Sequence, residues 1–409
     1  MEFWLPYGQT EVPVAIPDER LAGLLSPPED PSSQDLESLV GTALQCAVGG
    51  KTLLEAAGRA NKTVIAFNHE SVPCTLLANH LASRLLQAKA QAVSLLERAS
   101  DPTQPRSSRI FPEKDLETPC PVERHDPRIS SSVKVGQLDD GTEVLLNEAF
   151  ASAELRCTIT DVAINPFWGY SGGPSFVVPG LASEKTIKNC VRPAMRGARL
   201  PAVLTGNPTY ETLNRASQAQ PVDFAIHLVE RPDGRIAGAF VGDFMATFEQ
   251  ACALSAKTFR QTLQRKVDIV ISSAGGAPWD RTLFDASPSI IMATTACKDH
   301  GILILVAECP EGLGKFPSSG STIRDQKARL AQSRRTLSLE GLLEHSLQKT
   351  SSEHRTYLVS TLPEHQASLY SLLTAKSVGS AVQRASRHVG KDAKIALMPY
   401  GSHTVASIA

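Results

Sequence analysis

Short runs of β-forming apolar residues recur along this chain of 409 residues, and most are followed by a turn and a helical pattern. The run 63–67 is Thr-Val-Ile-Ala-Phe, and the run 268–273 is Asp-Ile-Val-Ile-Ser-Ser. Runs this short and apolar are typical of strands buried on both faces, and their alternation with helices predicts parallel sheets. We therefore expect two α/β domains, over 1–250 and 266–393, joined by a helical stretch at 243–264, with 394–409 as a candidate completion of the first domain.

The composition is that of an ordinary globular protein with a hydrophobic core. The net charge is −1, 42% of the residues are hydrophobic and 20% are charged, so no global field favours nucleic acid or an anionic membrane. No apolar run approaches the length of a membrane span, and the N-terminus lacks the pattern of a signal peptide. The eight cysteines form no CxxC pair, which argues against a zinc site and for reduced thiols. We expect a cytoplasmic protein that binds a small molecule, with no nucleic-acid or membrane partner and with its oligomeric state left open.

A candidate acid/base pair follows the first buried run. Asn68, His69 and Glu70 come directly after residues 63–67, and a helical pattern begins a few positions later. Ligands of open α/β sheets bind beyond the carboxyl ends of the strands. An imidazole beside a carboxylate at such a strand end is suited to general acid/base catalysis. The alternative is a hydrogen-bonded turn that caps the following helix.

A glycine-rich stretch at 168–176 is the second candidate ligand site. Its sequence is Trp-Gly-Tyr-Ser-Gly-Gly-Pro-Ser-Phe. Gly172 and Gly173 could let backbone N–H groups approach an anionic group, although a tight structural turn explains them equally well. Trp168 and Tyr170 could line a pocket, or they could be packed aromatic anchors. Ser171 does not lie in a Gly-x-Ser-x-Gly elbow, so it is not expected to be a hydrolase nucleophile.

Two further segments carry polar residues. Gly275 and Gly276 follow the run 268–273 and lead to Asp280, which repeats the pattern of a strand, a glycine turn and a polar residue. His125 and Asp126 lie at the edge of a proline-rich stretch, and we expect them to be a solvated surface pair.

Several of these segments together resemble the lactate racemase family. They are Leu5-Pro6-Tyr7-Gly8, Ile16-Pro17-Asp18-Glu19-Arg20, Gly169-Tyr170-Ser171-Gly172-Gly173, Val178-Pro179-Gly180-Leu181-Ala182-Ser183, Gly206-Asn207-Pro208, Gly242-Asp243, Asp268 to Ser272 with Gly275 to Asp280, and Ala375-Lys376-Ser377. Each motif is weak alone, and their order along most of the chain makes them specific. The resemblance implies two α/β domains joined by helices, with an active-site cleft between them. It also implies a nickel-pincer nucleotide cofactor that moves a hydride at the carbinol carbon of a 2-hydroxy acid.

The residues to which this family assigns its chemistry are not matched here. The resemblance places the family's substrate-gripping arginine at Ser71 and one catalytic histidine at Asn165. It places the cofactor-carrying lysine at Ser175 and the nickel-ligating histidine near Val191. A glutamine and a lysine of the second domain fall at Asp285 and Pro288. Neither serine nor valine can form the family's covalent link or metal bond at these places. We therefore expect no metal and no nickel-pincer nucleotide.

The function expected from the sequence is a divergent enzyme on the lactate racemase scaffold. It would be a metal-free isomerase, epimerase or lyase acting by acid/base chemistry on a small organic acid or a specialised metabolite. His69 is the candidate base, and Glu70 or Asp285 the acid or orienting group. Tyr170 and the N–H groups from Ser171 to Gly173 could stabilise an oxyanion. The expected substrate-binding set is Asn68, Asn165, Trp168, Tyr170, Ser171, Gly172, Gly173 and Asp280, with Asn68, Asn165, Trp168 and Asp280 facing the cleft.

Two other readings stay open. One is a nickel-pincer-dependent 2-hydroxy acid racemase that uses unusual residues. The other is a non-catalytic paralogue that binds a ligand on an inherited scaffold.

Overall fold

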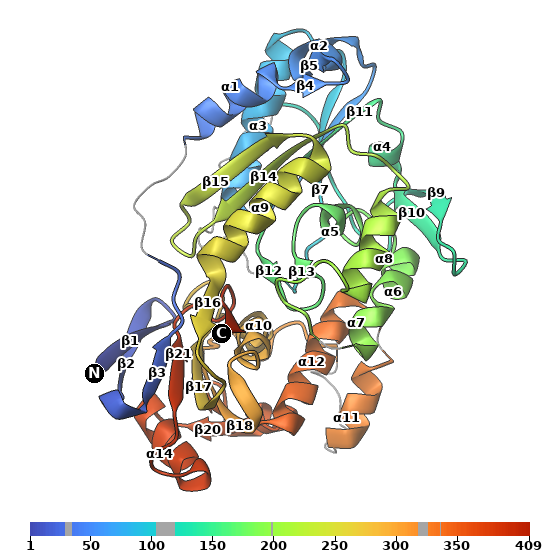
Figure 1. The fold of residues 1–409 in the computed structure, drawn as a ribbon. Helices are drawn as coiled ribbons and strands as arrows, with labels where there is room; N and C mark the ends of the chain where they lie inside the picture. Colours follow the sequence, from blue (N-terminus) through green and yellow to red (C-terminus); the bar gives the residue numbers. More distant parts are fainter. Residues whose placement is uncertain (29–34, 104–118, 198, 318–325, 336) are drawn as a thin grey trace. The chain divides into compact units, whose positions relative to one another are not determined.

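The structure is a computed structural model, and it describes residues 1–28, 35–103, 119–197, 199–317, 326–335 and 337–409 (Figure 1). The chain divides into two compact units. Unit 1 consists mainly of residues 1–28 and 257–409, and unit 2 of residues 35–101 and 119–256. Within the described ranges, no helix is long and apolar enough to cross a membrane.

The elements of unit 2 are these. The strands are β4 (Ala47–Val48), β5 (Lys51–Thr52), β6 (Thr63–Phe67), β7 (Val93–Glu97), β8 (Val122–Arg124), β9 (Ser132–Gln137), β10 (Glu143–Asn147), β11 (Leu155–Asp161), β12 (Ile164–Asn165), β13 (Gly169–Tyr170), β14 (Phe224–Glu230) and β15 (Ile236–Gly242). The helices are α1 (Leu36–Gln45), α2 (Leu53–Arg59), α3 (Val72–Gln87), α4 (Glu148–Ala151), α5 (Pro174–Val177), α6 (Glu184–Cys190), α7 (Arg192–Arg196), α8 (Pro208–Ser217) and α9 (Phe244–Phe259), the last of which runs into unit 1.

Unit 2 is built on a sheet of six strands in the order β15-β14-β11-β6-β7-β8. All neighbours are parallel except β14 and β15, which form an antiparallel hairpin. After β6 the chain adds β7 and β8 on one side, and it then adds β11, β14 and β15 on the other. The order therefore reverses between β6 and β11, and this boundary is the topological switch point of the sheet.

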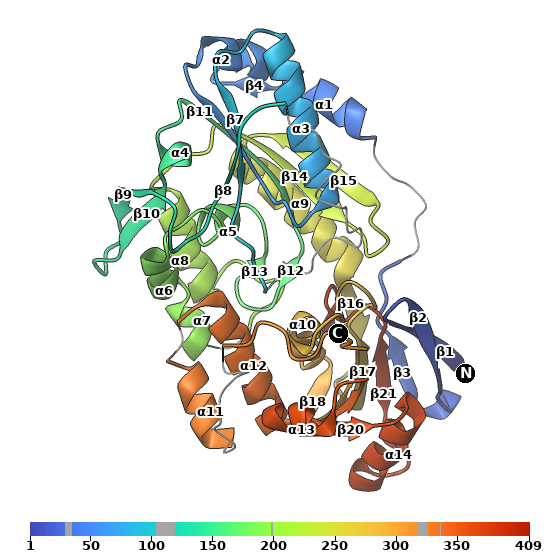
Figure 2. The same cartoon turned by 180° about the vertical axis from the view of Figure 1, so that it is seen from behind.

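Opposite faces of this sheet are covered by different helices. Ile65, Phe67 and Ile159 point to one face and pack in a core with Leu77 and Leu81 of α3. On the other face, His227 of β14 contacts two phenylalanines of α9. Figures 1 and 2 show α3 and α9 on these opposite faces. Since both faces are buried, the strands read as continuous apolar runs, and each large buried apolar side chain contributes about 1.5–3 kcal/mol.

The elements of unit 1 come from both ends of the chain. They are β1 (Glu2–Tyr7), β2 (Thr10–Ala15), the 3-10 helix Asp18–Arg20, β3 (Leu21–Leu24), β16 (Arg260–Leu263), β17 (Val267–Ser273), α10 (Leu283–Ala293), β18 (Cys297–Val306), α11 (Gln326–Ser333), α12 (Leu339–Glu353), β19 (Arg355–Val359), α13 (Glu364–Ala367), the 3-10 helix Ser368–Tyr370, β20 (Leu373–Ala375), α14 (Val378–Val389), β21 (Ile395–Met398) and β22 (Val405–Ile408).

The main sheet of unit 1 has six parallel strands in the order β20-β19-β18-β17-β21-β3. One face packs in a core with the β1–β2 hairpin and α14, and α10 lies against β17 and β18. Helix α10 contains Pro288, which has no N–H to donate to the carbonyl of Phe284. The hydroxyl of Ser287 donates to that carbonyl at 2.8 Å instead, so the proline is accommodated inside the helix.

The prediction of two α/β domains with parallel sheets is confirmed. The unit boundaries differ from the expected 1–250 and 266–393, because β3 pairs with β21 and so the first residues of the chain join its last ones. The helix expected at 243–264 ends at Phe259 and continues as β16. Strand β11 spans Leu155–Asp161, so it ends at a polar residue.

Candidate active site

Polar side chains gather at the carboxyl ends of four neighbouring parallel strands of unit 2. Glu230 ends β14, Asp161 ends β11, Asn68 follows β6 and Arg98 follows β7. Because these strands are parallel and adjacent, their carboxyl ends share one edge of the sheet. Ligands of open α/β sheets bind at this edge, at the switch point. The cluster is therefore our candidate active site.

A hydrogen bond joins the two strands that flank the switch point. The Nδ2 of Asn68 donates to Oδ1 of Asp161, and both side chains are buried. The Oδ1 of Asn68 accepts from the N–H of Glu70 at 3.2 Å. Asn68 thus links the carboxyl group of Asp161 to the turn between β6 and α3. Burial raises the pKa of Asp161 above its usual value, and nearby Arg98 and the hydrogen bond from Asn68 partly offset this effect.

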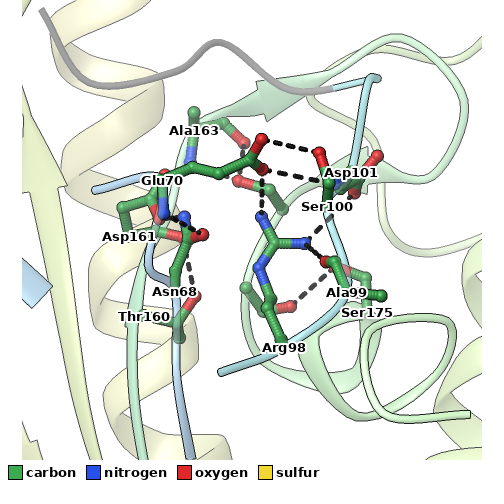
Figure 3. Close-up of polar contacts among 12 residues, drawn as sticks. Asn68, Glu70, Arg98, Ala99, Ser100, Asp101, Thr160, Asp161, Ala163 and Ser175 are labelled. Carbon is green, nitrogen blue, oxygen red and sulfur yellow. Dashed lines mark hydrogen bonds and ion pairs between the residues drawn. The ribbon is translucent and has the colours of Figure 1, made fainter. Parts of the chain in front are cut away.

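Arg98 is a buried cation among carboxylates (Figure 3). Its side chain is 2% exposed; Nη2 lies 3.6 Å from Oε2 of Glu70, and Nη1 lies 3.9 Å from Oδ2 of Asp101. Glu70 also accepts hydrogen bonds from the hydroxyl of Ser100 at 2.7 Å and from the N–H of Asp101 at 3.2 Å. Glu70 is therefore held as an acceptor that ties the β6–α3 turn to the loop after β7.

The guanidinium of Arg98 faces carboxylates that balance its charge, but it makes few hydrogen bonds to the described residues. Its Nη1 donates to the carbonyl of Ala99 at 3.3 Å. Its Nε and Nη2 have no hydrogen-bond partner among the described residues. Buried donors without partners are rare in folded proteins, so this group marks the edge as more than a packing site.

His69 lies beside Asn68 and is partly buried. Burial lowers the pKa of its imidazole, and the charge of Glu70 partly offsets this effect. Its Nδ1 is buried and has no hydrogen-bond partner among the described residues. A neutral imidazole with a nitrogen free of hydrogen bonds is suited to accept a proton.

Ser71 completes the turn as the N-cap of α3. Its hydroxyl accepts from the N–H of Cys74 at 3.4 Å and donates to Oε2 of Glu230 at 3.2 Å. The capping alternative considered for this turn is therefore present in the structure, carried by Ser71 rather than by His69 or Glu70.

The glycine-rich stretch lies against the same edge. A Cβ on Gly172 would come within 2.9 Å of the Asp161 carbonyl oxygen, and one on Gly173 would come within 2.4 Å of the ring of Phe248. Both glycines have positive φ, so the close approach and the backbone conformation each require glycine. The N–H of Ser171 donates to the carbonyl of Ala163 at 2.8 Å and so is engaged within the fold. Neither glycine N–H donates to another described residue, and these two groups remain the candidates for an oxyanion site.

Asn165, Trp168 and Tyr170 are all buried in this stretch. The Oδ1 of Asn165 accepts from the N–H groups of Phe167 and Trp168, so it shapes the turn. Trp168 has no exposed surface, and its Nε1 lacks a hydrogen-bond partner among the described residues. Tyr170 is 4% exposed. These three side chains are packed in the interior, and their contact with a ligand is still a prediction.

Asp280 and Asp285 belong to unit 1. The Oδ2 of Asp280 accepts from the N–H groups of Gly8 at 2.7 Å and Glu308 at 3.0 Å, and Oδ1 has no hydrogen-bond partner among the described residues. The Oδ2 of Asp285 accepts from the hydroxyl of Thr282, the N-cap of α10, at 2.6 Å. Asp280 thus joins three loops of unit 1, and Asp285 takes part in a helix cap.

Ser175 and Val191, the positions that the resemblance gives to the cofactor-carrying lysine and the nickel-ligating histidine, are both buried. The hydroxyl of Ser175 donates to the carbonyl of Gly172 at 2.9 Å, and its side chain is 5% exposed. Val191 is fully buried and has no lone pair to offer a metal. In the described part of the chain, no group of three or more His, Cys, Asp or Glu side chains is arranged to hold a metal ion.

Sequence reasoning missed Arg98, Asp101, Asp161 and Glu230. Asp161 ends β11, and Arg98 follows β7, whose apolar run is interrupted by Ser94. Their position in the sequence could have indicated them, because each of these residues lies at or just beyond the end of a short apolar run. His125 was expected at the surface but is 3% exposed, because its Nε2 lies 3.0 Å from the Ala182 carbonyl and its Nδ1 lies 3.4 Å from the Asn147 amide nitrogen.

Two six-stranded, mainly parallel sheets define a protein of the α/β class. The lactate racemase N-terminal domain matches residues 7–195, and the lactate racemase C-terminal domain matches residues 262–406. The chain therefore belongs to the lactate racemase family.

Individual relatives are distant in sequence and match nearly the whole length of the chain. A lactate racemase from Thermoanaerobacterium thermosaccharolyticum is 25% identical, and one from Lactiplantibacillus plantarum is 27% identical, each over 97% of both chains. Among solved structures, the lactate racemase apoprotein from T. thermosaccharolyticum superposes with a TM-score of 0.81 at 23% identity, covering 100% of both chains. A protein from Thermotoga maritima superposes with a TM-score of 0.64 at 14% identity, over 93% of this chain and 100% of its own.

Proposed function

We propose that this member of the lactate racemase family is an isomerase, epimerase or lyase that acts on a small organic acid or specialised metabolite by acid/base chemistry. His69 is the base, and Glu70 orients the turn that carries it. The observation that carries the proposal is the switch-point edge of unit 2, where a neutral imidazole, a buried carboxyl group and a buried cation lie at the carboxyl ends of adjacent parallel strands. Such an edge can take a proton from a substrate and balance the charge that forms.

The proposal includes chemistry without the family's nickel-pincer nucleotide. The residues present do not fit that group, since Ser175 offers a hydroxyl already bonded to Gly172 and Val191 offers only a buried alkyl group. Ser71, at the position of the substrate-gripping arginine, caps α3. The donor set at these positions is therefore structural, and no step is assigned to the nucleotide.

Arg98 supplies a cation at the same edge. Its guanidinium could balance negative charge that develops on a bound acid, because it is buried and its attraction to charge is weakly screened by water. Gly172 and Gly173 are the backbone donors proposed for an oxyanion.

The decisive experiment is the His69→Ala variant with an intact fold. The matched control is His80→Ala, because His80 is an exposed histidine on α3. Both enantiomers of lactate and of malate are the probes, and exchange of the substrate C–H with solvent deuterium is the readout. We expect His69→Ala to lose exchange by about 10²–10⁴-fold and the control to keep it. Exchange retained in His69→Ala would reject the assignment of the base.

Two measurements separate this proposal from its alternatives. Metal analysis and intact mass of the purified protein test the nickel-dependent alternative, and nickel together with a mass adduct would overturn the metal-free proposal. Tight binding of a small acid by the wild-type protein, with no exchange under any condition, would favour the non-catalytic paralogue.

A further inference from the structure

We propose that the carboxyl edge of the unit 1 sheet binds a primary ammonium group, held by Asp280, Glu308 and Tyr7. The inference concerns unit 1 and stands apart from the acid/base chemistry proposed for unit 2. Tyr7 ends β1, Asp280 lies in the loop after β17, and Glu308 lies just beyond the end of β18. Because β17 and β18 are adjacent parallel strands, both loops leave the sheet at the edge where ligands of α/β sheets bind.

Gly8 brings the carboxylates of Asp280 and Glu308 together. Its N–H donates to Oδ2 of Asp280 at 2.7 Å, and the N–H of Glu308 donates to the same oxygen at 3.0 Å. The side chain of Glu308 lies directly against Gly8, because a Cβ on Gly8 would collide with Oε2 of Glu308. Gly8 also has a φ of 55°, so both its backbone and this contact require glycine. The two carboxylates therefore contact the same residue.

Asp280 has a second oxygen that the fold does not use. Its side chain is 1% exposed, and Oδ1 has no hydrogen-bond partner among the described residues. Oδ2 alone holds the loops together, so the structural role of Asp280 leaves Oδ1 unexplained. Buried charges in proteins are normally paired, and a buried oxygen without a partner indicates a missing ligand, ion or water. Within the described ranges neither Asp280 nor Glu308 forms an ion pair, and neighbouring Arg281 pairs with Glu311 at 2.6 Å.

The titratable neighbours of these carboxylates are exposed to their negative charge. Burial raises the pKa of Tyr7 to about 12, and the charges of Glu308 and Asp280 add to the shift. Burial also raises the pKa of Cys309 to about 12, with contributions from Asp280, Asp285 and Glu308. Tyr7 and Cys309 are therefore neutral at neutral pH, and the carboxylates favour a cation at this edge.

A primary ammonium group matches the acceptors in number and in charge. It carries one positive charge and three N–H donors, and Oδ1 of Asp280, the carboxylate of Glu308 and the hydroxyl of Tyr7 offer three acceptors. Tyr7 and Glu308 are half-buried and form the outer part of the site, whereas Asp280 is its floor. A metal ion fits less well, because in the described part of the chain no three His, Cys, Asp or Glu side chains are arranged to hold one.

Binding of ethylamine to the full chain, followed by ligand-observed NMR, tests the site without any turnover. Glu308→Gln removes one charged acceptor, and we expect it to weaken binding by about 10–100-fold, the usual loss for a hydrogen bond to a charged group. The matched control is Glu311→Gln, which should keep the wild-type affinity because Glu311 pairs with Arg281 at the surface. No binding of ethylamine to the wild type, or equal affinities of the two variants, would overturn the proposal.

A second variant and two competitors test the hydrogen bonds. Asp280→Asn keeps an oxygen for the N–H groups of Gly8 and Glu308 and places N–H donors where Oδ1 was, so it should abolish binding while the protein still folds. If thermal unfolding shows that this variant does not fold, Glu308→Gln decides alone. Tetramethylammonium has the charge without N–H donors and should not displace ethylamine. Equal competition by tetramethylammonium, or stronger competition by Mg²⁺ or K⁺, would overturn the assignment of a primary ammonium group.

Discussion

The side-chain amide of Asn68 donates to the carboxyl group of Asp161 across the boundary where the strand order of the unit 2 sheet reverses. The Asn68→Asp variant would place two carboxyl groups in this contact. Like charges raise the pKa of such a pair, so the folded state binds protons more tightly than the unfolded one. We expect the variant to lose about 1–3 kcal/mol of stability at neutral pH and to regain it as the pH falls below the raised pKa. Chemical denaturation at several pH values measures this difference; a loss that does not vary with pH would contradict it.

Replacing the buried cation should be more costly than replacing an exposed one. Arg98→Met leaves the carboxylates of Glu70 and Asp101 without their charge partner. Breaking a buried pair in this way costs about 3–5 kcal/mol. Arg235→Met is the control, since Arg235 pairs with Asp233 at the surface and exposed pairs contribute about 0–1 kcal/mol. Similar losses of unfolding free energy in the two variants would refute the charge-balancing role of Arg98.

The tight contact of Gly173 can be tested by adding one methyl group. A Cβ there would lie 2.4 Å from the ring of Phe248, and the residue has a φ of 48°. Gly206 also has positive φ, at 77°, but a Cβ there would meet no atom within 4 Å. We expect Gly206→Ala to cost about 1 kcal/mol and Gly173→Ala about 1–3 kcal/mol more. Thermal unfolding of the two variants separates the two effects. Gly206→Ala reports backbone strain alone, and Gly173→Ala reports backbone strain together with the steric clash against Phe248.

His227 should make unfolding sensitive to acid. Its Nδ1 lies 2.9 Å from the hydroxyl of Thr247, which donates its own hydrogen to the carbonyl of Asp243, so the histidine nitrogen is the donor. Burial lowers the pKa of His227 to about 3. Between about pH 6.5 and pH 3, His227 binds a proton in the unfolded state but not in the folded state. The free energy of unfolding is therefore full above about pH 6.5 and decreases as the pH falls towards 3.

The variant that tests this is His227→Phe, which suits a site between two phenylalanines. Between pH 7 and 5 it should lose about 2 kcal/mol less than the wild type. Urea unfolding at both pH values gives the comparison. Identical acid sensitivity in the two proteins would show that His227 is protonated without unfolding.

The fold was more predictable than the site. Runs such as 63–67 and 268–273 are apolar because both faces of their sheets are covered, and this pattern is visible in the sequence. The turn that carries His69 was found because it directly follows such a run. Pairing of β3 with β21 was not visible, since nothing local in Leu21–Leu24 indicates that its partner is Ile395–Met398, near the other end of the sequence.

The neighbours of a polar side chain were the least predictable feature. Arg98 and Asp161 are separated along the chain and meet only because their strands lie in one sheet. His125 looked like a surface residue because its sequence neighbours are polar. Its burial depends on Asn147 and the carbonyl of Ala182, which only the folded structure brings to it.

The pairing of β3 with β21 also constrains the order in which the chain can fold during synthesis. The described residues of unit 2 lie within 35–256, so this unit can form while the remaining chain is still being made. Unit 1 must keep Leu21–Leu24 unpaired until Ile395–Met398 have been synthesised and have left the ribosome. During that interval the first strands of the protein are exposed edges, so a nascent chain that is stalled or truncated before β21 would present them to other chains.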